Sequence, residues 1–60
     1  MPFAEILDEV NQLHRVSTRL EGLAEQHPPV CEALLTIAGS IRNTATLLAV
    51  LVATKVPKPT

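Results

Sequence analysis

The apolar stretch 33–53 limits the fold of this chain more than any other feature of its sequence. Arg42 is the only charged residue among these twenty-one, and after residue 44 the only polar side chain is that of Thr46. A helix with this surface must bury more than one face, because apolar surface is driven out of water. We therefore expect the chain to complete its core with other copies of itself or with a lipid bilayer.

The short length of the chain, 60 residues, points the same way. A domain of this size buries only about 60% of the surface of its unfolded chain and needs a further source of stability. Cys31 is the only cysteine, so no disulfide can form within this sequence. Two histidines and one cysteine offer few metal ligands. Self-association is the remaining source for a soluble chain.

Residues 2–26 show the periodicity of an amphipathic helix. Apolar residues recur at alternating spacings of three and four, which is typical of a helix that packs along a seam. Pro2 suits the first helical turn, where its missing N–H is not needed. The predicted seam consists of Phe3, Ile6, Val10, Leu13, Ser17, Leu20 and Ala24.

The pair Pro28 and Pro29 separates this helix from a second one. Each proline disfavours helical conformation in the residue before it and removes a backbone donor, so the first helix should end near Gln26. Pro29 then suits an early position of a second helix, predicted over 29–55 because Pro57 disfavours its continuation. The same three-and-four spacing predicts its seam as Val30, Leu34, Ile37, Ile41, Thr44, Leu48 and Leu51.

We predict an all-α fold in which residues 1–56 form an antiparallel helical hairpin and residues 57–60 a disordered tail. A short connection between two long helices favours the antiparallel arrangement. Two hairpins related by a two-fold axis would form a four-helix bundle, and further copies would give a higher oligomer. The predicted oligomer interface consists of Leu13, Leu20, Leu34, Ile37, Ile41, Leu48, Leu51 and Val52.

A single-span membrane protein, with helix 33–53 in the bilayer, is the first alternative. Nine Leu, Ile and Val residues would contribute about −4 kcal/mol to insertion. Arg42 near the centre would oppose insertion by roughly 2.5 to 3.5 kcal/mol, and the neighbouring polar residues would add to this. The first helix would also lose the partner for its seam. These two observations favour the soluble bundle.

A small nucleic-acid-binding regulator is the second alternative. Asn11, Arg15, Thr18 and Arg19 form a locally basic outward face, which a two-fold axis would double. Acidic residues surround the arginines on the same helix, and the net charge of −1 provides no general attraction for nucleic acid. A solvated helix face is therefore the preferred interpretation of these four residues.

No motif in the sequence indicates catalysis, a cofactor or a metal. His14, His27 and Cys31 are the only candidates for a metal ligand or nucleophile, and no regular spacing of carboxylates accompanies them. Cys31 lies in the first turn of the predicted second helix, a position that can activate a thiol, but free cysteines are commonly buried as small hydrophobic residues. We leave open a site formed across subunits and expect no enzymatic activity.

Two further expectations complete the interpretation. The N-terminal segment is acidic and lacks the features of a secretory signal, which predicts a cytoplasmic location. Arg42 should reach solvent or pair with a carboxylate such as Glu9 or Glu21, because an unpaired buried charge is very costly. We therefore interpret the chain as a non-enzymatic, self-associating hairpin with an interaction or scaffold role.

Overall fold

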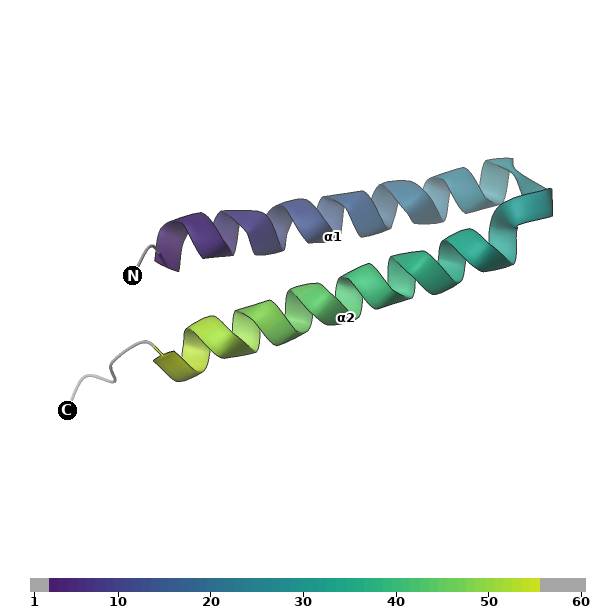
Figure 1. Ribbon diagram of the computed structural model, residues 1–60. Coiled ribbons are helices and arrows are strands. Elements are labelled where there is room, and N and C mark those ends of the chain that lie inside the picture. The colour runs from purple at the N-terminus through teal and green to yellow at the C-terminus, as the bar shows by residue number, and fades with distance from the viewer. Residues whose placement is uncertain (1–2, 56–60) are drawn as a thin grey trace.

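The computed structural model describes residues 3–55, which form two antiparallel helices with no strand among them (Figure 1). Helix α1 spans Phe3–Gln26, the 3₁₀ helix η1 spans Pro28–Val30, and helix α2 spans Cys31–Lys55. The predictions of an all-α fold and of a helical hairpin are confirmed. Pro2 and the predicted disordered tail 57–60 lie outside the described residues.

The turn follows from the two prolines. His27 takes a non-helical conformation, with φ −132° and ψ 74°, as expected for a residue that precedes a proline. The N–H of Val30 donates to the carbonyl of His27 at 3.0 Å, and the N–H of Cys31 donates to the carbonyl of Pro28. The chain therefore reverses through one 3₁₀ turn, and α2 begins at Cys31, two residues later than the predicted Pro29.

A buried serine defines how the two helices face each other. The hydroxyl of Ser17 in α1 donates a hydrogen bond of 2.9 Å to the carbonyl oxygen of Ala38 in α2. Positions seven residues further along each helix have the same relation, because seven residues are close to two helical turns. Toward the open end these positions are Val10 and Ala45, and toward the turn they are Ala24 and Cys31.

The register of α2 differs by one residue from the predicted seam. Leu34, Ile41 and Leu48 are half-buried, but the other four predicted seam residues are exposed. At each of these four positions, the next residue in the sequence packs against α1 instead. These following residues are Cys31, Ala38, Ala45 and Val52, of which the last three are buried and Cys31 is half-buried.

Side-chain size explains this correction. The two alanines at the seam allow the helix backbones to approach closely, and dispersion contacts increase with the number of atoms brought into contact. A seam through Ile37 and Leu51 would place larger side chains between the helices. The hydrophobic period alone could not distinguish the two registers, because apolar residues occupy both.

The consequence is a hairpin with a very small core. Among residues 3–55 the buried hydrophobic side chains are those of Val10, Ala24, Ala38, Ala45 and Val52. No leucine or isoleucine in this range is fully buried, and several are exposed. A single hairpin therefore leaves many of its large aliphatic side chains only partly covered.

Candidate interaction surface

The hairpin has two broad faces of different character, one on each side of the seam. Each side of the seam can be found from the position of a residue relative to a seam residue. The residue four positions later lies on one side of the seam. The residue three positions later and the residue one position earlier lie on the other side. Glu21 and Arg42 are four positions after Ser17 and Ala38, and they form an ion pair. The same offset therefore leads to the same face on both helices.

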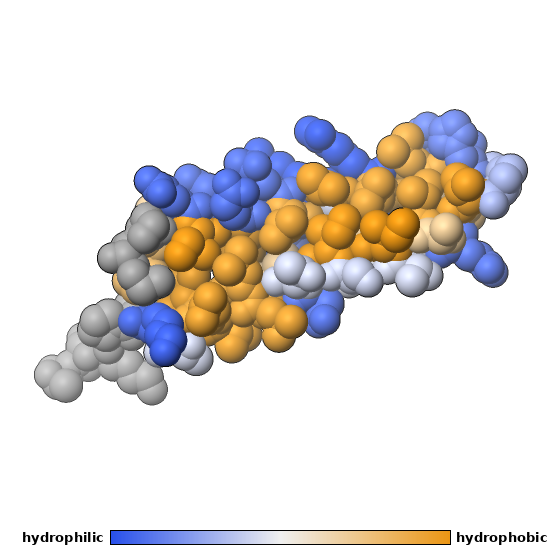
Figure 2. All heavy atoms as spheres, viewed as in Figure 1, coloured by the Kyte–Doolittle hydropathy of each residue, from blue (hydrophilic) through white to orange (hydrophobic). Residues whose placement is uncertain are grey.

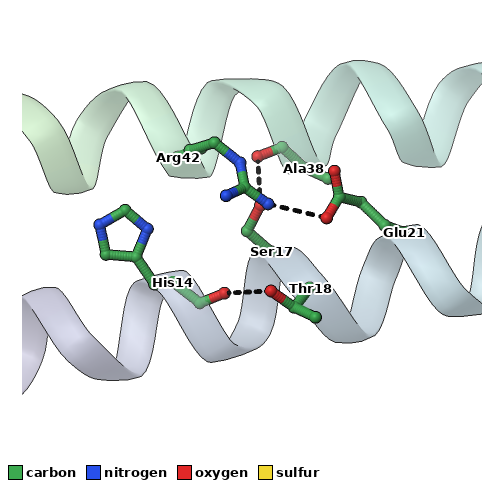
Figure 3. Close-up of polar contacts among 6 residues, drawn as sticks. All are labelled: His14, Ser17, Thr18, Glu21, Ala38 and Arg42. Atoms are coloured by element: carbon green, nitrogen blue, oxygen red, sulfur yellow. Dashed lines mark hydrogen bonds and ion pairs between the residues drawn. The ribbon is translucent and has the colours of Figure 1, made fainter.

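The face that carries this ion pair is mostly polar, although Leu35 also lies on it, and we call it the polar face. The Nη2 atom of Arg42 donates to Oε1 of Glu21 at 2.7 Å, and both side chains remain almost half exposed to solvent. His14 lies on this face one heptad before Glu21 (Figure 3), and its carbonyl accepts a 3.0 Å hydrogen bond from the Thr18 hydroxyl. The prediction that Arg42 pairs with a carboxylate is confirmed for Glu21.

The opposite side of the seam carries the large aliphatic residues of both helices, and we call it the aliphatic face. Figure 2 shows hydrophobic side chains extending over both helices, with hydrophilic residues along the outer edge of α1. Glu9, Thr44 and Lys55 are the polar residues at its positions within the two helices. The aliphatic residues are Ile6, Leu13, Val16, Leu20, Leu23, Val30, Leu34, Ile37, Ile41, Leu48 and Leu51.

The exposure of these side chains indicates whether a single hairpin can remain in water without a partner. Ile37 is 49% exposed and Leu51 is 46% exposed, although both are among the most hydrophobic residues. Val16, Leu23 and Val30 are also exposed, and the remaining aliphatic residues of this face are half-buried. Monomeric soluble proteins rarely leave a contiguous apolar surface of this extent in water. The aliphatic face is therefore the candidate interaction surface.

The predicted interface residues fall mainly on this face. Leu13, Leu20, Leu34, Ile37, Ile41, Leu48 and Leu51 all lie there. Val52 is only 5% exposed and instead packs within the hairpin. The predicted interface omitted Ile6, Val16, Leu23 and Val30. Ile6 and Val30 belong to the predicted seams of the two helices, and Val16 and Leu23 lie beside the predicted α1 seam, so the sequence already contained the signal for all four.

The outer side of α2 adds a smaller apolar region near the open end of the hairpin. Leu47 is 61% exposed and Val50 is 51% exposed. The stretch Pro28–Lys55 is long and apolar enough to cross a membrane by length and composition, and only 17% of its most apolar window is buried in the hairpin. A core helix of a soluble protein passes the same test but is mostly buried.

The candidate nucleic-acid face lies on the outer side of α1. Asn11, Arg15, Thr18 and Arg19 are all exposed. An open hollow of about 370 Å³ is lined by His14, Arg15, Thr18 and Arg19. Helix α1 also carries five acidic residues against its two arginines, so its overall charge repels phosphate.

The candidate metal and nucleophile residues are not brought together. His14 lies in the middle of α1, whereas His27 and Cys31 flank the turn. Across residues 3–55, no three side chains of His, Cys, Asp or Glu are grouped closely enough to hold a metal ion. Cys31 is a half-buried free thiol that occupies a seam position opposite Ala24. Its position is that of a small packing residue.

Comparison with known protein families, with curated protein sequences and with solved structures gave no significant match. The functional interpretation therefore rests on the chemistry of the described surfaces.

Proposed function

We propose that the chain is a self-associating helical-hairpin module with an interaction or scaffold role and no enzymatic activity. In this proposal two copies bury their aliphatic faces against each other and form a four-helix bundle. The observation that carries it is the exposure of large aliphatic side chains from both helices on one face of the hairpin.

The energetic argument rests on what the single hairpin lacks. Burial of apolar surface stabilises a fold by roughly 25 cal/mol per Å², and a fully buried Leu or Ile contributes about 1.5 to 3 kcal/mol. The hairpin fully buries none of its described Leu and Ile side chains, so part of this stabilisation is still to be gained. A second copy supplies a surface of matching length and chemistry, and a two-fold interface buries every contributing residue twice.

The test compares two substitutions in α2. Ile37 and Leu35 are two residues apart and almost equally exposed, at 49% and 47%, but only Ile37 lies on the aliphatic face. Ile37→Asp should abolish self-association, since it places a charge in the apolar interface, whereas Leu35→Asp should leave the oligomer unchanged. Sedimentation equilibrium in detergent-free buffer measures both. A parent chain that is a folded monomer at micromolar concentration would refute the proposal.

A membrane-associated form is the second candidate, and the exposure of Leu47 and Val50 favours it. These residues lie away from the aliphatic face, on the side of α2 that points away from α1. Flotation of the purified chain with neutral phosphatidylcholine vesicles distinguishes the two candidates. A soluble bundle remains in the dense fraction, whereas a membrane-spanning chain floats with the vesicles and requires detergent for purification.

A further inference from the structure

We infer that the two hairpins pair with their turns at opposite ends, so that α1 lies beside α1 and α2 beside α2 of the second copy, with Glu9 of each copy paired to Arg19 of the other. This inference rests on the proposed self-association through the aliphatic face. It specifies the orientation of the second copy, which that proposal leaves open.

Two-fold symmetry allows two orientations in which the aliphatic faces meet with their helices aligned. If the two-fold axis runs along the hairpin, both turns lie at one end and α1 contacts α2 of the second copy. If the axis lies across the hairpin, the turns lie at opposite ends and each helix contacts its own counterpart in antiparallel fashion. The residues at the edges of the aliphatic face distinguish these two orientations.

The α1 edge of the aliphatic face is charged. Glu9 lies at this edge, one residue before the buried Val10, and Arg19 lies further around the same side of the helix. The two residues are equally distant from position 14. His14 lies at the same level along the hairpin as Ile41 of α2. Ser17 faces Ala38, and His14 and Ile41 are each three residues from this pair, toward the open end. Both points lie close to the middle of their helices, where a transverse two-fold axis would pass.

A transverse axis at this level brings Glu9 of one copy opposite Arg19 of the other, twice by symmetry. The same axis places Ile41 beside Ile41 and Leu48 opposite Leu34 in the centre of the bundle. A longitudinal axis would instead place Glu9 at the level of Thr46 and Arg19 at the level of Thr36 on α2 of the second copy. Neither charge would then have a residue of opposite sign at its own level.

The α2 helices are consistent with a transverse axis. Ser40 is the residue before Ile41, so an axis at the level of Ile41 brings the two copies of residue 40 near each other. Leu47 lies on the side of α2 that points away from α1, so its exposure does not distinguish the two orientations.

Charge reversal provides the first test. Glu9→Arg and Arg19→Glu should each weaken the dimer about tenfold, because each places two pairs of like charges in contact. The double variant should recover the parent dissociation constant to within about threefold. Asp8→Arg makes the same change of charge one residue from Glu9, on the solvent side of α1, and should have no effect. A double variant as weak as the two singles combined would overturn the inference.

Cross-linking provides the second test, in a Cys31→Ser background. Ser40→Cys should form a disulfide-linked dimer rapidly under mild oxidation, because both copies of residue 40 lie near the transverse axis. Thr46→Cys, on the polar side of the hairpin, should not. With a longitudinal axis the two copies of residue 40 lie on diagonally opposite helices, and a dimer by sedimentation that does not cross-link would overturn the orientation. A monomer by sedimentation would instead refute the proposed self-association.

Discussion

The hydroxyl of Ser17 lies 2.9 Å from the carbonyl oxygen of Ala38 and is fully buried between the two helices. It is the one buried polar side chain among residues 3–55. The acceptor is a helix carbonyl, which has a second lone pair beyond the one used inside the helix. Because the donor can reach this oxygen only in one alignment of the helices, the bond helps to fix their register.

Ser17→Ala should lower the free energy of unfolding by about 0.5 to 1.5 kcal/mol, because a buried hydrogen bond is lost with little change in volume. Ser17→Leu should lower it by roughly 1 to 3 kcal/mol, because the larger side chain forces the helices apart. Urea unfolding at one fixed protein concentration measures both. Thr18→Ala, in which an exposed local hydrogen bond is removed, serves as the control. If Ser17→Leu proved neutral, the seam would not be closely packed.

A substitution at Ala45 tests whether the seam of α2 requires small side chains. It is 0% exposed, so Ala45→Leu should destabilise the protein by roughly 1 to 3 kcal/mol through overpacking. Ala53→Leu makes the same change at an exposed position of the same helix and should change the stability by less than about 0.5 kcal/mol. Thermal unfolding followed by circular dichroism compares the two. The register predicted from periodicity alone would give the seam position to Thr44, and Ala45→Leu would then be mild.

The ion pair between Glu21 and Arg42 should contribute little to stability. Its side chains are 46% and 45% exposed, and exposed pairs typically contribute about 0.2 to 1 kcal/mol. A double-mutant cycle with Glu21→Gln and Arg42→Gln measures the coupling energy. We expect the coupling energy to fall as the salt concentration is raised from about 0.05 M to about 0.5 M, because salt screens the attraction between exposed charges. A coupling of several kcal/mol would mean that the pair becomes buried in the assembled protein.

Gly22 and Gly39 lie within helices and should be replaceable by alanine with a gain in stability. A Cβ atom at either position would have no atom within 4 Å apart from those of the adjacent residues and the local helix backbone. Alanine has a helix propensity about 1 kcal/mol more favourable than glycine, so each substitution should raise the free energy of unfolding by up to about that amount. Chemical denaturation of the two single variants checks this. Destabilisation at either site would reveal a close contact with another molecule there.

Much of the hairpin follows from local sequence signals. Pro28 and Pro29 determine where the first helix ends, because the residue before a proline avoids helical conformation and the ring removes a donor. The a and d spacing from Phe3 to Ala24 identified the seam of α1, including the polar member Ser17. The cost of burying an unpaired charge made a solvent contact or a carboxylate partner for Arg42 predictable, and Glu21 was one of the two carboxylates named.

Only the tertiary structure decided which stripe of α2 faces α1. The sequence contains two adjacent apolar stripes in this helix, one through Ile37 and Leu51 and the other through Ala38 and Val52. A prediction from periodicity assigns the more hydrophobic stripe, with the larger residues, to the seam. In the structure the stripe of smaller residues lies at the seam, because small side chains let the two backbones approach closely and leave the large side chains outside. The sequence alone thus determined two helices and a turn, whereas the close approach of those helices determined that the large aliphatic residues form an open face.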